Sequence, residues 1–289
     1  MSLRNNGKQK EGITIETKRL NGNCAEDIVI AAELLKNSGL VAIPTETVYG
    51  LAADATNGAA VERIFKAKGR PQDNPLIVHI SSYEQLAQLV SHIPEHAKRL
   101  METFWPGPLT VILPKSNLVP DQVSAGLPTV AVRFPSHPVA RAVIQEAGVP
   151  LAAPSANVSG SPSPTAAAHV LHDLDGKIDA VIDGGPCTVG LESTVITLAE
   201  ETPVLLRPGA VTLEQLQQVL GTVKMADAVL HQLKQGSVAA SPGMKYKHYA
   251  PKADLTLVEP EGMAMHQDQV MRKGETGRKR AEEKRSLGF

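Results

Sequence analysis

The stretch PTETVYGLAADATNGAAVERIFKAKGRPQDNPLIVHI, residues Pro44–Ile80, decides the fold and the place of several polar side chains. This stretch follows a short apolar strand, contains a helix predicted at residues 59–68, and ends in a second strand, Leu76–Ile80. Side chains of a strand alternate between its two faces, so Ile77 and His79 share one face and the other three residues share the opposite one. We therefore expect hydroxyls, cations and one histidine to gather at the strand ends and loops around a single helix.

Three cations lie at the end of that helix: Lys66, Lys68 and Arg70. Lys66 is expected to pair with Glu62, four residues earlier, on the solvent side. Lys68 falls near the buried edge of the helix instead. Cations at the end of a helix often do no more than complement its dipole. The alternative is that Arg70 and Asn74 contact a phosphate or a base edge, and the sequence leaves both readings open.

The alternation of strands and helices continues outside this stretch, with short connections. Further strands are predicted at residues 13–15, 40–43, 109–113, 129–134, 180–182, 194–198 and 203–206. Further helices are predicted at residues 24–37, 83–90, 94–103, 138–146, 165–171 and 213–220. This order predicts an α/β fold in which helices pack on a twisted mixed sheet.

Composition and charge exclude several classes of protein. Of the 289 residues, 42% are hydrophobic and 20% charged, as in an ordinary globular protein, and the formal net charge of −1 is unlike that of a protein that wraps nucleic acid. The two cysteines, Cys24 and Cys187, fit no metal spacing and no disulfide framework, so we expect free thiols in a reducing cytosol. The N-terminus lacks a secretory pattern, and no apolar run approaches the ~20 residues that span a bilayer. We predict a cytoplasmic protein that does not enter the membrane.

Arg133 is the most unusual polar residue of the predicted strands, because it lies inside an apolar one. A buried arginine is costly unless it is paired, and no acidic residue lies within four positions along the strand. A planar guanidinium without a local acid is suited to a ligand carboxylate or phosphate. Thr129, on the same face, adds a hydroxyl.

Further polar groups follow at other strand ends. The loop 150–164, PLAAPSANVSGSPSP, is rich in hydroxyls and opens the helix predicted at 165–171. Such residues suit ordinary caps and turns, or an anion at the helix start, and both readings stay open. Ser193 and Arg207 also lie beside glycine at strand ends. The recurrence of such groups predicts one shared site better than any of them does alone.

Seven segments give the sequence a family resemblance: PTETVYGL, KAKGRPQDNPLIVHI, FWPGPLT, VAVRFPSHP, PSANVSGSPSPT, GLESTVI and LLRPGA. In this order they resemble the YrdC-type threonylcarbamoyl-AMP synthase family over roughly residues 13–220. The strip SPGMKYKHYAPKA, at 241–253, is similar to the linker of the family's long form, which carries a second, smaller α/β domain. The resemblance implies a twisted sheet with helices around a large polar, positively lined cavity.

The resemblance also sets the expected domains. We assign residues 13–220 to a YrdC-like catalytic domain, 221–253 to a linker, and 254–289 to the remnant of a second domain followed by a disordered tail. The last segment is polar and mixed in charge, with few apolar residues, as disordered segments are. Here the sequence departs from the long form, whose α/β pattern continues.

The reaction implied by the resemblance joins L-threonine, bicarbonate and ATP, accompanied by Mg²⁺, into threonylcarbamoyl-AMP and pyrophosphate. The product would pass to the tRNA threonylcarbamoyl-transfer complex for t6A modification at position 37. By motif, the threonine-binding residues are Thr47, His79, Arg133, Ala153 and Ser193. Lys68 and Arg70 correspond to catalytic residues. The ATP-binding residues are Arg70, Asn74, Thr129, Ser155, Asn157, Ser163, Arg207 and His248. No residue is assigned to a metal site.

Two other functions remain as alternatives. The same cavity could bind double-stranded RNA or tRNA without chemistry. A basic strip that contains Lys245, Lys247, His248 and Lys252 favours such weak RNA binding, whereas the net charge of the protein counts against it. A carbamoyl-transfer domain of a larger maturation enzyme is the third possibility, and the lack of zinc-finger-like cysteines counts against it.

Overall fold

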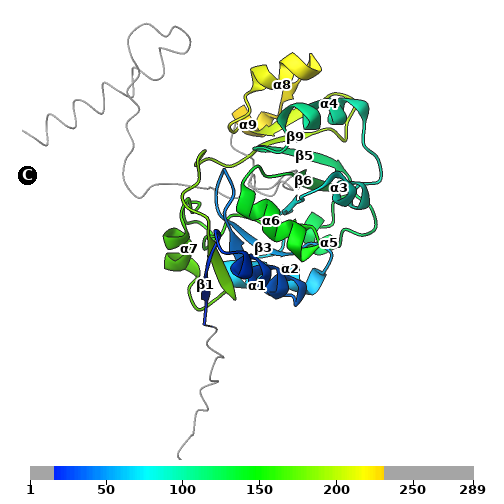
Figure 1. The fold of residues 1–289 in the computed structure, drawn as a ribbon. Coiled ribbons are helices and arrows are strands. Elements are labelled where there is room, and N and C mark those ends of the chain that lie inside the picture. Colours follow the sequence, from blue (N-terminus) through cyan, green and yellow to red (C-terminus); the bar gives the residue numbers. More distant parts are fainter. Residues whose placement is uncertain (1–15, 231–289) are drawn as a thin grey trace, which may run out of the picture. The chain divides into compact units, whose positions relative to one another are not determined.

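A computed structural model describes residues 16–230 (Figure 1). Its strands are β1 (Lys18–Asn21), β2 (Val41–Ile43), β3 (Gly50–Asp54), β4 (Ile77–His79), β5 (Leu109–Pro114), β6 (Thr129–Arg133), β7 (Leu151–Ala152), β8 (Ala180–Asp183), β9 (Thr194–Thr197), β10 (Val204–Arg207) and β11 (Lys224–Met225). Its helices are α1 (Ala25–Lys36), α2 (Gly58–Lys68), α3 (Tyr83–Leu89), α4 (Glu95–Phe104), α5 (Asp121–Ser124), α6 (Pro138–Ala147), α7 (Ala167–Leu174), α8 (Leu213–Leu220) and α9 (Asp227–Leu230).

The strands form one 11-stranded sheet in the order β1-β8-β2-β3-β7-β4-β6-β5-β9-β10-β11. Pairing is mixed: β4 runs parallel to β6, whereas β5 runs antiparallel to β6 and parallel to β9. The predicted α/β class with a mixed sheet is confirmed. Because β4, β6, β5 and β9 are successive neighbours, residues from distant parts of the sequence meet on adjacent strands.

Helix α2 shows how local sequence sets the element that carries the cations. The side chain of Asn57 caps it by accepting the backbone N–H groups of Ala59 and Ala60. Gly69 ends it with φ of 63°, a left-handed conformation that glycine adopts without strain. Lys68, in the last turn, is only 2% exposed, which confirms its predicted place on the buried side.

The two faces of the sheet are covered differently. The main core cluster covers one face and includes residues from α2, α3, α4, α5, α7 and α8. On the other face, a second cluster lies under α1 and α6, which pack together in front of the sheet (Figure 1). Within residues 16–230, a third, small cluster on that face contains no buried residue from a helix: Ile77, Ile112, Ala131, Val195 and Leu206. The polar residues on this face of the strands therefore lie beside a cluster to which no described helix contributes a buried side chain.

The predicted alternation of β4 and β6 is confirmed by these clusters. Ile77 belongs to the small cluster, whereas Val78 belongs to the main core. Ala131 likewise lies in the small cluster, whereas Val130 and Val132 lie in the main core. Two-residue periodicity thus places His79 and Arg133, at the ends of these strands, on the side of the small cluster.

Strands β1, β3, β7 and β11 are absent from the sequence prediction. The sequences of β3 (GLAAD) and β7 (LA) are rich in small residues and carry no β-branched side chain. Each is paired on both sides, β3 with β2 and β7 and β7 with β3 and β4, so long-range pairing forms them. Both β11 and α9 fall within the segment predicted as a linker, and β11 pairs parallel with β10.

Some predictions fall outside residues 16–230. These are the strand at 13–15, most of the linker including the basic strip and His248, and the tail at 254–289. Within the described range, no helix is long and apolar enough to span a bilayer.

Candidate active site

Arg133, at the end of β6 and 3% exposed, is the centre of the candidate site. Its Nη2 lies 2.6 Å from Glu46 Oε1, its Nη1 donates to Thr47 Oγ1 at 2.8 Å, and its Nε donates to the Gly107 carbonyl at 3.2 Å. The two hydrogen bonds occupy two of the five N–H groups of an arginine, whereas the approach of Nη2 to Glu46 is an ion pair in which neither atom has a hydrogen-bond partner among the described residues. Each terminal nitrogen therefore keeps at least one N–H, as a bidentate pair with a carboxylate requires.

No acid lies near Arg133 along its own strand, as the sequence shows, but the fold brings one to it from elsewhere. The partner, Glu46, comes from the loop between β2 and β3, far away in the sequence, and its side chain is 8% exposed. A guanidinium this deeply buried requires a counter-charge, and the fold supplies one. Arg133 nevertheless keeps two donors for a ligand.

His79 lies beside Arg133 because the register of β4 and β6 pairs the two residues. It is 3% exposed, and its Nδ1 has no hydrogen-bond partner among the described residues. Burial, together with the charge of Arg133, lowers the pKa of His79 to about 3. The ring is therefore neutral at neutral pH and offers an uncharged hydrogen-bonding group to the site.

This histidine predicts a measurable sensitivity to acid. Its pKa is ~6.5 in the unfolded chain and lower in the folded protein, so its contribution to stability is complete above about pH 6.5 and is lost as the pH falls toward about 3. We expect His79→Gln to reduce the fall in the free energy of unfolding between about pH 7 and about pH 4 by about 2–3 kcal/mol. Urea unfolding of both proteins across this range measures it, and parallel pH profiles would contradict it.

Ser193 connects a second arginine to the same patch. Its hydroxyl lies 2.7 Å from Thr110 Oγ1, and Thr110 pairs with Arg133 in the register of β5 and β6. Arg207 Nη2 donates to the Ser193 carbonyl at 2.9 Å and to its hydroxyl at 3.1 Å. Ser193 and Thr110 thus connect Arg207, at the end of β10, to the strand position beside Arg133.

Ala153 lies beside β4, since its backbone N–H donates to the carbonyl of Ile77 at 3.0 Å. All residues assigned by motif to threonine binding are buried, and each is at most 5% exposed: Thr47, His79, Arg133, Ala153 and Ser193. Contacts link four of them across separate segments: Thr47 and His79 adjoin Arg133, and Ser193 reaches the strand position beside Arg133 through Thr110.

Lys68 anchors the loop 150–164, called the serine-rich loop below, to helix α2. Its ammonium donates to the carbonyls of Ser155 and Asn157, the second at 2.5 Å. Burial, and then the nearby charge of Arg70, lowers the pKa of Lys68 to about 7, while the two carbonyl acceptors favour its charged form. At most one of its three N–H groups is left for a ligand, so the geometry favours a positioning role for Lys68.

The structure places the other residues assigned to ATP on several separate elements. Ser163 Oγ donates to Glu192 Oε1 at 2.6 Å, next to Ser193 in the sequence, and also lines a pocket of about 510 Å³ beside α7. The Arg70 guanidinium lies 5.2 Å from the centre of the Phe65 ring. Asn74 is only 1% exposed, and Thr129 is half-buried on the face of β6 that carries Arg133.

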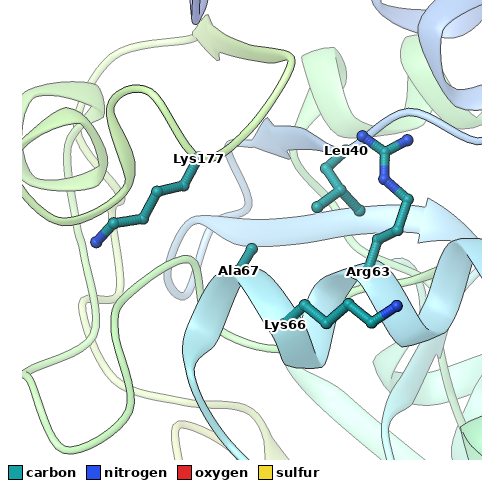
Figure 2. Close-up of a pocket in the computed structure, with 5 residues that line it drawn as sticks. All are labelled: Leu40, Arg63, Lys66, Ala67 and Lys177. Atoms are coloured by element: carbon teal, nitrogen blue, oxygen red, sulfur yellow. The ribbon is translucent and has the colours of Figure 1, made fainter. Parts of the chain in front are cut away.

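A separate pocket of about 300 Å³ lies over the outer side of α2 (Figure 2). Its lining residues are Leu40, Arg63, Lys66, Ala67 and Lys177. In Figure 2 the ends of Lys66 and Lys177 point away from each other, and the Lys177 ammonium donates to the Asp173 carbonyl. Arg63 pairs with Asp179 at 2.9 Å. Two of these three cations are therefore engaged with the protein itself.

The predicted pair between Glu62 and Lys66 is wrong. Glu62 instead accepts a hydrogen bond from Gln122 Nε2 at 3.3 Å, because α5 packs against α2 at this point. Lys66 is exposed at the solvent side of the helix. It takes no part in the candidate site.

Two residues of the site are missing from the sequence prediction. Thr110 could be found from alternation, because it lies with Ile112 on the face of β5 opposite Val111. Glu46 gives a weaker signal, an acid between two threonines in an otherwise uncharged segment. The expected free thiols are confirmed, since neither Cys24 nor Cys187 forms a disulfide and both are half-buried.

Two family models match the chain. The model described as "Telomere recombination" (Sua5_yciO_yrdC) matches residues 33–209, and the model described as "Threonylcarbamoyl-AMP synthase, C-terminal domain" matches residues 211–286. The threonylcarbamoyl-AMP synthase of Pyrococcus abyssi is 55% identical over 232 residues, covering 80% of this chain and 68% of that protein. The threonylcarbamoyl-AMP synthase of Bacillus subtilis is 52% identical over 253 residues, covering 87% and 72%.

Solved structures agree with these matches. P. abyssi Sua5 complexed with L-threonine aligns with a TM-score of 0.81 at 49% identity, over 93% of this chain and 77% of that one. E. coli YciO aligns with a TM-score of 0.59 at 26% identity, over 68% and 95%. Fold and site together define an α/β protein of the Sua5/YrdC class. Within that class, this chain belongs to the threonylcarbamoyl-AMP synthase family, as its sequence motifs indicate.

Proposed function

We propose that this protein forms threonylcarbamoyl-AMP and pyrophosphate from L-threonine, bicarbonate and ATP. The observation that carries the proposal is the buried guanidinium of Arg133, which keeps at least one N–H on each terminal nitrogen beside the neutral ring of His79. That arrangement suits the carboxylate of a small polar amino acid. The similarity to a Sua5 structure complexed with L-threonine supports threonine as that amino acid.

In this proposal Arg133 binds the carboxylate of threonine in a bidentate pair. His79, Thr47 and Ser193 supply uncharged groups for the substrate's hydroxyl and amine, and Ala153 supplies backbone contacts. Arg70 and Arg207 neutralise the phosphates of ATP, while Lys68 holds the loop that contains Ser155 and Asn157 in place. The two substrates would then meet near Ser193, which contacts Arg207 and Thr110.

The reaction would proceed by positioning more than by acid–base catalysis. The threonine amine attacks the carbon of bicarbonate, or of CO₂ derived from it, and the loss of water from bicarbonate leaves a carbamate. A carbamate oxygen then attacks the α-phosphorus of ATP, and the bond to pyrophosphate breaks. Holding reactants in contact lowers such barriers by ~7–11 kcal/mol, and fixed cations stabilise the charge that develops.

Mg²⁺ belongs to this proposal as the ion that accompanies ATP. Residues 16–230 hold no group of three or more His, Cys, Asp or Glu side chains that could bind a metal ion, so the phosphates are its natural ligands here. Bound there, it would offset charge on the departing pyrophosphate.

The finer assignments rest on the family alone. We propose that the product passes to the tRNA threonylcarbamoyl-transfer complex for t6A modification at position 37, in the cytoplasm. The contributions of His248 and of the basic strip to ATP or RNA binding also remain proposals, because both lie outside the described residues.

Pyrophosphate release tests the proposal directly. With purified protein and ATP, we expect release to require both L-threonine and bicarbonate, because the carbamate must form before the α-phosphate is attacked. A coupled pyrophosphate assay with each substrate omitted in turn measures this. Equal release without threonine would show a different activity.

A further inference from the structure

Glu46 is a buried carboxylate whose two oxygens hold different parts of the site. Oε1 lies 2.6 Å from Arg133 Nη2, and Oε2 accepts from the backbone N–H of Ser136 at 3.2 Å. The Glu46 carbonyl also accepts from Val189 N at 2.8 Å. The residue thereby joins the loop before β3 to the segment after β6 and to the loop before β9.

The titratable groups whose charges act near this ion pair are neutral at neutral pH. Burial lowers the pKa of His137, although Glu46 opposes the change, and burial and Arg133 lower the pKa of His79. Burial raises the pKa of Cys187 to about 11, so it remains a thiol. The local charges of Arg133 and Glu46 therefore cancel.

A buried ion pair of zero net charge, such as Arg133 with Glu46, discriminates between ligands by their net charge. A zwitterionic amino acid adds one carboxylate and one ammonium and leaves the net charge beside this pair at zero. A simple carboxylate adds an uncompensated negative charge beside Glu46, which is costly in a buried position. Without Glu46 the preference would move toward the simple carboxylate, because Arg133 would then be the unbalanced charge.

We infer that Glu46 is a positioning residue of the threonine site: it orients Arg133 and makes the site select an amino acid over a simple carboxylate. The inference rests on the proposed function, because it takes threonine as the ligand of Arg133. Glu46 acts through Arg133 and through the charge balance of the site. The ligand's α-ammonium supplies the positive charge that offsets Glu46 once the ligand carboxylate has engaged Arg133.

The test compares two ligands by titration calorimetry on the full-length protein: L-threonine and (R)-3-hydroxybutanoate, which is threonine without its amino group. We expect the unmutated protein to bind threonine at least about tenfold more tightly. In Glu46→Gln, which keeps the size of the side chain and an oxygen for Arg133, we expect that affinity ratio to fall about tenfold. A purely structural role would weaken both ligands alike and leave the ratio unchanged.

Asp179→Asn is the matched control, because it removes a carboxylate from the ion pair with Arg63 outside the site. Its ratio should equal that of the unmutated protein. An unchanged ratio in a folded Glu46→Gln variant, checked by thermal unfolding, overturns the inference. If that variant does not fold, the unmutated protein decides, since equal affinities for the two ligands also overturn it. Failure of the unmutated protein to bind threonine at all overturns the proposed function instead.

Discussion

Replacing Arg133 with alanine should reduce threonine-dependent pyrophosphate release by about 100-fold to 1000-fold. The variant loses the two N–H groups that we assign to the substrate carboxylate, and removal of a buried hydrogen-bonded charge from such a pair costs about 2–5 kcal/mol. Steady-state assays with varied threonine measure the change, which should appear mainly at low threonine concentration. Turnover equal to that of the unmutated protein would contradict the assignment.

The same substitution should also destabilise the fold, by about 3–5 kcal/mol, because Glu46 is left as an uncompensated buried charge. The double variant Arg133→Ala with Glu46→Gln removes both charges and should recover much of that stability. It should recover none of the activity. Urea unfolding and the pyrophosphate assay on both variants separate the two effects. A double variant that is no more stable than the single one would show that Glu46 is not the source of the cost.

Replacing Lys68 with methionine should weaken the binding of ATP and leave the binding of threonine almost unaffected. The variant leaves the carbonyls of Ser155 and Asn157 without their donor, at about 1–3 kcal/mol for each unsatisfied buried group. We therefore expect the KM for ATP to rise about tenfold or more and the free energy of unfolding to fall by about 2 kcal/mol.

Lys66→Met is the matched control for this prediction. Lys66 lies two residues earlier on the same helix and is exposed, so its loss should change neither constant. Separate titrations of ATP and threonine distinguish the outcomes. If the binding of threonine weakens as much as the binding of ATP, Lys68 does not act through the serine-rich loop alone.

Local patterns in the sequence predict much of this site. Alternation along β4 and β6 correctly places His79 and Arg133 on the side of the small cluster, because a strand's side chains must alternate. The spacing on α2 likewise places Lys68 on its buried side. Each of these predictions depends on one element only, and a single segment contains the information that it needs.

Contacts between distant segments could not be predicted in this way. The partner of Arg133 comes from a loop that only the strand order brings near, so a search along β6 alone misses Glu46. The sequence prediction misses strands β3 and β7 for a similar reason, since their small residues form strands only through pairing on both sides. The carbonyl partners of Lys68 also require the loop to fold back on α2.

We propose above all that this chain joins threonine, bicarbonate and ATP in one product. Incubation with ¹³C-bicarbonate, L-threonine and ATP, followed by mass spectrometry of the nucleotides formed, tests it most directly. We predict threonylcarbamoyl-AMP whose carbamoyl carbon carries the label, in an amount that matches the pyrophosphate released. Pyrophosphate released with only AMP, and no labelled adduct of threonine, would contradict the account.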